Sequence, residues 1–310
     1  MKIAFPIDKP FLMASGQPGP HVVITAGVHG DEYEPMLAAM QLIEQLQQNI
    51  IAGSVSIIPV VNPTAFSAGT RTGDDGLDLA RICPGNSNGS SSHQAAAKLS
   101  ALIQTADYYI DLHTGGREFD IYPLAGYMLH ASAEILARQQ WMAKAFNLPV
   151  VWGTDSALEG RTLSVARDVN VPAIYVEYGG GEPFKKQVVQ SYAQGCLNVL
   201  AGLQMIRVEN EITPQLQYWV EDYTPNNGHL QSKMLAPEEG VFIPAIALGD
   251  AIQKGQEWGR IVNLRNNSEV TVTADSEGIV LFLRATSFVR IGNSLGGVLP
   301  ISKPGKKLIP

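Results

Sequence analysis

Residues 21–48 read HVVITAGVHGDEYEPMLAAMQLIEQLQQ. The run HVVITAG has the composition of a buried strand, whereas YEPMLAAMQLIEQLQQ repeats apolar residues every three or four positions, which is typical of an amphipathic helix. His29, Gly30, Asp31 and Glu32 stand between the two. A strand followed directly by a helix predicts an α/β unit whose polar junction lies at the carboxyl end of the strand.

The same alternation continues towards residue 206. Strands are expected at 54–62, 107–113, 149–153 and 172–180, and helices at 93–104, 132–146, 161–168 and 185–206. Residues 67–92, rich in Gly, Asp, Ser and Asn, are expected to form a long loop kept for function. This order predicts a mostly parallel, mixed sheet flanked by helices, with ligands bound at the carboxyl ends of its strands.

The composition changes after about residue 210. Short β-rich runs punctuated by glycine replace the helical periods, which predicts a division into an α/β domain (1–210) and an all-β domain (211–310). The Gly-Asp and Lys-Gly turns of the second part resemble those of biotinyl/lipoyl-type barrels. No lysine stands at a hairpin tip in the carrier context, so we expect a structural role for this domain.

Composition argues against several classes of partner. The formal net charge is −7 and no dense run of Lys or Arg occurs, which argues against nucleic acid. No apolar run approaches a membrane span, and Pro6, Asp8 and Pro10 interrupt any secretory signal. Cys83 and Cys196 have no paired spacing, so neither a disulfide framework nor a cysteine zinc site is indicated. We expect a cytoplasmic protein without membrane contact, and a homo-oligomer is left open.

His29, Glu32 and His113 have the pattern of a metal site. His29 and Glu32 follow a strand and are three residues apart, so they face the same side of an opening helical turn. His113 ends a second apolar strand, and Asp111 on the same strand face could support it. Three His/Glu ligands leave a fourth position of zinc to water. The alternative is that the histidines are surface or capping residues and that the acids only favour a helix N-terminus.

Glu177 interrupts the apolar run PAIYVEYGGG just before three glycines. An acid in a buried strand is costly unless it is paired or functional. A general base beside zinc-bound water is one interpretation, and an ion pair with an arginine is the other.

Four stretches together resemble the succinylglutamate desuccinylase/aspartoacylase family, a branch of the zinc carboxypeptidase-like fold that hydrolyses N-acyl amino acids. They are HGDE (29–32), NPTAFSAGTRTGDDGLDLARICPGN (62–86), DLHTGG (111–116) and VEYGGG (176–181). The resemblance spans most of the chain. It implies Zn²⁺ on His29, Glu32 and His113, and a catalytic glutamate at Glu177.

The resemblance also implies roles for arginines. Arg71 would polarise the scissile carbonyl, and Arg81 would bind a substrate carboxylate, although Ala80 replaces the asparagine that precedes it in the family. Arg117 and Arg161 could substitute for that asparagine. The implied activity is hydrolysis of the amide of a small N-acylated substrate. A zinc carboxypeptidase acting on short peptides and a non-catalytic small-molecule-binding protein are the alternatives.

Overall fold

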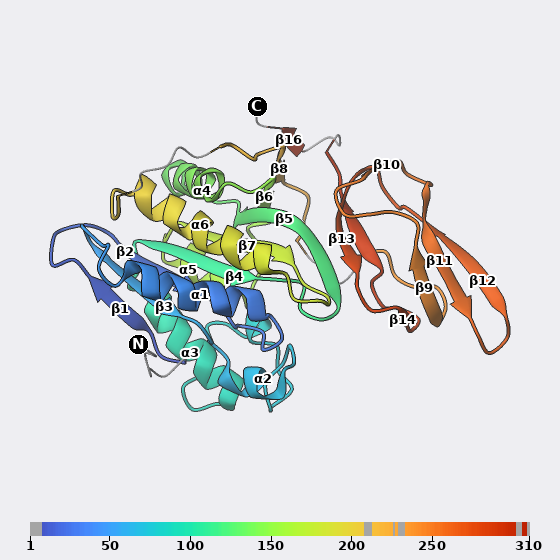
Figure 1. Ribbon diagram of the computed structural model, residues 1–310, viewed down its shortest axis with the longest axis horizontal. Helices are drawn as coiled ribbons and strands as arrows, with labels where there is room; N and C mark the ends of the chain where they lie inside the picture. The colour runs from blue at the N-terminus through green and yellow to red at the C-terminus, as the bar shows by residue number, and fades with distance from the viewer. Residues whose placement is uncertain (1–7, 208–212, 226, 229–232, 302–305, 309–310) are drawn as a thin grey trace.

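A computed structural model describes residues 8–207, 213–225, 227–228, 233–301 and 306–308. Its centre is a large sheet, whose main path runs β1-β3-β2-β4-β7-β5-β6-β8-β16 (Figure 1). The strands β3, β2, β4 and β7 are mutually parallel, as are β5, β6 and β8, which confirms the predicted mostly parallel, mixed sheet. The bounds are Phe11–Ala14 (β1), His21–Thr25 (β2), Ser54–Ile58 (β3), Tyr108–His113 (β4), Phe119–Met128 (β5), Val150–Thr154 (β6), Ala173–Gly179 (β7), Tyr218–Asp222 (β8) and Lys306–Leu308 (β16).

Helices cover both faces of this sheet. One layer contains α1, α4 and α6, whose apolar stripes share a core with the sheet, and α3 and α5 pack with the 3₁₀ helix η1 in a second core on the opposite face. These cores explain the apolar periodicity of the helices, because each helix buries one stripe against the strands. The bounds are Tyr33–Leu46 (α1), Ser91–Ile103 (α3), Ala133–Phe146 (α4), Thr162–Asp168 (α5), Lys186–Gly202 (α6) and Leu79–Arg81 (η1).

The expected loop at 67–92 is mostly irregular but not entirely so. It contains the end of helix α2 (Pro63–Ala68) and all of η1, and α3 already begins at Ser91. Asn62 accepts a hydrogen bond from the Ala65 N–H at the start of α2, which is an ordinary N-cap. The loop crosses the carboxyl ends of the strands and brings Arg71 and Asp78 to His29.

Strand β5 was not predicted, and neither was β1. The run FDIYPLAGYM contains Pro123 and Gly126, which obscure a strand pattern. Pro123 falls between Ile121 and Leu124, where the pairing of β5 with β7 shifts register, and a bulge of this kind tolerates a residue without an N–H. Because β5 is antiparallel to β7 and parallel to β6, it is the strand that makes the centre of the sheet mixed.

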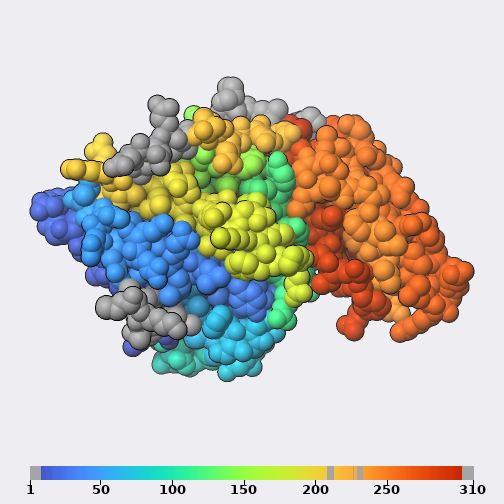
Figure 2. Space-filling model, viewed as in Figure 1, coloured from blue at the N-terminus to red at the C-terminus, as the bar shows by residue number. Residues whose placement is uncertain are grey.

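The C-terminal third is rich in strands, as predicted, and residues 240–299 form one end of the molecule (Figures 1 and 2). A four-stranded sheet has the order β12-β11-β9-β14, and β10 and β15 pair with β13, which also pairs with β5. Trp258 and Phe242 are buried in the core of this part. The bounds are Gly240–Pro244 (β9), Ala251–Ile252 (β10), Glu257–Asn263 (β11), Ser268–Thr273 (β12), Gly278–Arg284 (β13), Phe288–Val289 (β14) and Gly296–Leu299 (β15).

The division at residue 210 stays a prediction, because 208–212 lie outside the described residues. Strands from both sides of that point share the large sheet, since β8 pairs with β6, β16 with β8, and β13 with β5. No helix within the described ranges is long and apolar enough to cross a membrane. Cys83 and Cys196 are free and buried.

Candidate metal centre and pocket

His29, Glu32 and His113 come together at the carboxyl ends of β2 and β4. One potential ligand atom from each lies within 4.8 Å of the others, and all three residues are buried. The Nδ1 atoms of His29 and His113 lie 2.7 Å and 3.0 Å from the two oxygens of the Glu32 carboxylate. Two imidazole nitrogens and a carboxylate that converge on one point are a donor set suited to zinc.

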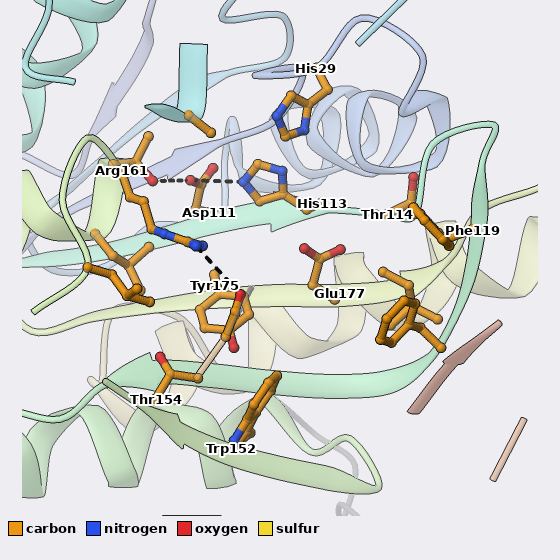
Figure 3. A pocket seen from close by; sticks show the side chains of 18 of the residues that line it. His29, Asp111, His113, Thr114, Phe119, Trp152, Thr154, Arg161, Tyr175 and Glu177 are labelled. Atoms are coloured by element: carbon orange, nitrogen blue, oxygen red, sulfur yellow. Dashed lines mark hydrogen bonds and ion pairs between the residues drawn. The ribbon is translucent and has the colours of Figure 1, made fainter. Parts of the chain in front are cut away.

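Further carboxylates lie behind the two histidines. The Nε2 atom of His29 is 3.1 Å from Asp78, and that of His113 is 3.1 Å from Asp111, a contact drawn in Figure 3. Asp111 also accepts hydrogen bonds from Thr25 and Thr162. A carboxylate on the outer nitrogen fixes the ring and its tautomer, so that Nδ1 is left to bind a metal.

The charges of this group hold its carboxylates in the ionised form. Burial alone would raise the pKa of Glu32, but His29 and His113 lower it to about 2. Burial would likewise raise the pKa of Asp78, and its hydrogen bond and attraction to His29 bring it well below the ordinary value. Burial would lower the pKa of His113, but the charges of Asp111 and Glu32 raise it well above the ordinary value. The carboxylates are therefore ionised and paired with the imidazoles, and a bound cation would take the place of the imidazole protons.

Glu177, on β7, faces the same space. Figure 3 shows its carboxylate directed towards His113. Its Oε2 atom is buried and has no hydrogen-bond partner among the described residues. Burial raises the pKa of Glu177 to about 8, with His113 opposing the shift and Glu32 adding to it. The ion pair with an arginine that sequence reasoning left open is not among the ion pairs of the described residues.

The predicted arginines occupy different places. Arg71 donates to Asp78 at 3.0 Å, and its Nη1 lies 3.4 Å from His29 Nδ1, so it stands beside the metal-binding group. Arg81 and Arg161 line the same pocket. Burial, followed by the charge of Arg81, lowers the pKa of Arg161 to about 10. Ala80 lines the pocket beside them.

Arg117 is not brought to this pocket. Its side chain is exposed on the segment between β4 and β5, and it is not among the described residues that line the cavity. Its backbone N–H donates to Asp31. The structure therefore lends no support to a substrate-binding role for Arg117.

Gly115 and Gly116, which follow β4, allow neighbouring segments of the chain to pack closely against the backbone. A Cβ on Gly115 would lie 2.1 Å from the Phe119 carbonyl oxygen, and a Cβ on Gly116, whose φ is +57°, would lie 2.6 Å from Asp31. Gly115 does line the pocket, but its small size chiefly lets β5 begin close to the end of β4.

Sequence reasoning missed two parts of the site. Asp78 lies in the stretch 62–86 but had no predicted role, although its position three residues before Arg81 was a usable signal. The opposite wall of the pocket is apolar and had no local signal, because it is assembled from β5, β6 and β13. It includes Phe119, Ile121, Trp152 and Phe282. The pocket is partly open to solvent and has a volume of about 100 Å³, which suits a small ligand.

Comparison with known proteins agrees with this arrangement. The model of the succinylglutamate desuccinylase/aspartoacylase catalytic domain matches residues 18–203. The chain is 28% identical over 290 residues to N-alpha-acetyl-L-2,4-diaminobutyric acid deacetylase from Halomonas elongata, covering 91% of this chain and 83% of that protein. It is 33% identical over 125 residues to succinylglutamate desuccinylase from Shewanella putrefaciens, covering 34% of this chain and 36% of that protein.

Solved structures show the same fold. A succinylglutamate desuccinylase/aspartoacylase from Rhodobacter sphaeroides superposes with a TM-score of 0.83 at 26% identity, covering 92% of this chain and 87% of that one. The product-bound ectoine utilization protein from Ruegeria pomeroyi gives a TM-score of 0.83 at 24% identity, covering 93% and 87% of the two chains, and shows the fold alone. The named relatives are deacylases, and the chain belongs to the succinylglutamate desuccinylase/aspartoacylase family.

Proposed function

We propose that this protein is a zinc-dependent hydrolase that cleaves the amide bond of an N-acyl amino acid. One observation carries the proposal. Glu177 is a half-buried glutamate whose Oε2 atom is buried and has no hydrogen-bond partner among the described residues, and its carboxylate is directed towards a His/Glu/His group. Burying such a carboxylate is costly unless a reaction uses it. A metal-free binding protein would have no need of this arrangement.

The residues fit a metal. His29, Glu32 and His113 would hold it, and Asp78 and Asp111 would orient the two imidazoles. When bound, zinc supplies Lewis-acid polarisation of the scissile carbonyl and makes water a better nucleophile at neutral pH.

The chain's own groups would carry the proton and the developing charge. A cation on the neighbouring ligands would act with the charge of Arg71 to lower the pKa of Glu177 from its raised value and favour the carboxylate. The Glu177 carboxylate then accepts a proton from the attacking water and passes it to the amide nitrogen as the C–N bond breaks. Arg71, beside His29, donates to the carbonyl oxygen as that oxygen gains negative charge. The products are a carboxylate and a free amine.

The pocket favours a substrate with a single carboxylate on its amino-acid part. Arg81 and Arg161 supply the positive charge, and Ala80 offers no amide to help bind a second carboxylate. The amino acid named for the Halomonas elongata deacetylase has one carboxylate, so N-α-acetyl-L-2,4-diaminobutyrate is the first substrate to test. We propose a small N-acylated molecule as the partner in preference to nucleic acid or membrane, and the cytoplasm as the location.

The test is release of primary amine by zinc-loaded protein. The panel contains N-α-acetyl-L-2,4-diaminobutyrate, N-acetyl-L-alanine, N-acetyl-L-aspartate, N-succinyl-L-glutamate and two dipeptides with free N-termini. Preference for an N-acyl amino acid supports the proposal. Preference for dipeptides would support the carboxypeptidase alternative, and no turnover of any compound would contradict an enzymatic role.

A further inference from the structure

We propose that the Phe119 end of the pocket is the acyl subsite, and that it accepts a short uncharged acyl group and rejects succinyl. The inference rests on the proposed deacylase function and adds which acyl group is removed. The family comparison leaves this open, because the named relatives include both a deacetylase and a desuccinylase.

The wall at this end is apolar and built from two strands. The rings of Phe119 and Phe282 meet edge to face with centroids 5.4 Å apart. Phe282 on β13 is also the register partner of Ile121 on β5. All three residues line the pocket and are at most 6% exposed. They form a compact apolar surface, suited to methyl and methylene groups and unable to pair with a charge.

The arrangement of the pocket gives the direction of the substrate. In Figure 3, Arg161 lies on one side of the Glu177 carboxylate and Phe119 lies on the other. The Arg81 backbone lies beside Gly160, the residue before Arg161, since a Cβ on Gly160 would be 2.3 Å from the Arg81 carbonyl oxygen. In an N-acyl amino acid with a neutral acyl group, only the amino-acid part carries a carboxylate. With that carboxylate at the arginines and the scissile carbonyl near Glu177, the acyl group must extend towards Phe119.

Three cations lie near this end of the pocket, but none of them is among the described residues that line it. The Arg284 guanidinium stacks on the Phe119 ring at 5.6 Å and donates to the Ser294 carbonyl oxygen. Lys185 pairs with Asp120 at 2.8 Å. Arg284 and Lys185, like the exposed Arg117, are absent from the described lining of the cavity. A succinyl carboxylate placed here would therefore lose water without gaining an ionic partner.

The experiment compares acyl groups on a constant amine. The kcat/KM values of the zinc-loaded protein are measured for N-acetyl, N-butanoyl and N-succinyl derivatives, each made with L-2,4-diaminobutyrate and with L-alanine. We expect the succinyl compounds to be slower than the acetyl and butanoyl compounds by about 10²-fold or more, since the carboxylate is left unpaired. Succinyl turnover equal to or faster than acetyl turnover would overturn the inference while leaving the deacylase function intact. No hydrolysis in either series would overturn both the acyl-subsite inference and the proposed deacylase function.

A variant adds a second, independent test. Ile121→Arg places a cation in the apolar wall, and Ile121→Met is the matched control that keeps the wall apolar. We expect Ile121→Arg to raise the succinyl-to-acetyl ratio of kcat/KM by about tenfold or more relative to Ile121→Met, because the new charge pairs with the succinyl carboxylate. Should Ile121→Arg not fold, the Lys185→Met and Arg284→Met variants serve instead. An unchanged substrate ratio in both supports the inference, and a selective loss of succinyl turnover would show that one of these cations reaches the substrate.

Discussion

His113 and Glu177 are register partners on the adjacent parallel strands β4 and β7. Neighbouring strands lie about 4.8 Å apart, and residues at equal register point to the same face. The sheet itself therefore sets a candidate metal-binding imidazole beside a proposed proton acceptor. Asp111 and Tyr175 are partners two positions earlier, so the support for His113 comes from the same strand pair.

The first prediction concerns the metal. The purified protein is expected to bind one zinc per chain, and His29→Ala and His113→Ala to lower the zinc content towards zero, because each removes one of three ligands. His21→Ala, at the opposite end of β2, is the control. Metal content is measured by mass spectrometry and folding by circular dichroism. Unchanged zinc in both variants would contradict the assignment.

The second prediction concerns the carboxylates behind the histidines. Asp78→Asn and Asp111→Asn are each expected to weaken zinc binding roughly 10- to 100-fold, because the outer imidazole nitrogen loses its charged acceptor. Competition with a chromophoric chelator gives the affinity. Asp74→Asn, an exposed change in the same loop, is expected to leave it unaltered. If Asp78→Asn and Asp111→Asn both kept the zinc affinity of the wild type, the two carboxylates would only support packing.

The third prediction separates proton transfer from metal binding. Glu177→Gln is expected to keep its zinc and lose roughly 10²–10⁴-fold in kcat, since the amide is nearly isosteric but cannot take up and return a proton. Amine release and metal content are measured on the same preparation. Near-normal turnover would remove Glu177 from the mechanism.

The fourth prediction concerns Asn227, which lies beyond the catalytic family match and is 6% exposed. It accepts from the Asp155 N–H at 2.9 Å, and the carbonyl of the next residue, Gly228, accepts from Arg161 at 3.5 Å. Asn227→Ala is expected to raise KM about tenfold through poorer placement of Arg161, the equivalent of about one hydrogen bond. We expect kcat and zinc content to change little. A fall in kcat at constant KM would contradict this positioning role.

The fifth prediction concerns pH and the long loop. Burial would raise the pKa of Asp75, but hydrogen bonds from Ser90, Ser92 and Leu77 bring it well below the ordinary value. A carboxyl group whose pKa is lower in the folded state stabilises the fold above its unfolded pKa of about 3.9, and this contribution is lost as the pH falls towards the folded value. Asp75→Asn is therefore expected to lower Tm at pH 7, with a difference that shrinks below pH 4. The exposed Asp275→Asn is the control in the same thermal scans. If Asp75→Asn lowered Tm equally at pH 7 and below pH 4, the charge of Asp75 would not be the source of the stabilisation.

The sequence by itself determined the alternation of strands and helices and the residues of the candidate metal site. These features are local: apolar periods report burial over a few residues, and His29, Glu32, His113 and Glu177 each stand at the end of an apolar run next to glycines or a helix start. The parallel order of the strands then places such ends at one edge of the sheet. A single sequence was enough for that step, because both signals lie within short windows.

Only the tertiary structure decided how the rest of the pocket is built. It placed β5 antiparallel to β7, brought Asp78 to His29 across the long loop, and set Phe282 from β13 against Phe119. It also left Arg117 in solvent and turned Arg161 into the pocket, although both arginines follow similar polar, glycine-containing stretches. These outcomes depend on which strands pair and at what register. Pairing is fixed by the summed burial of residues far apart in the chain, and no local window of sequence contains that information.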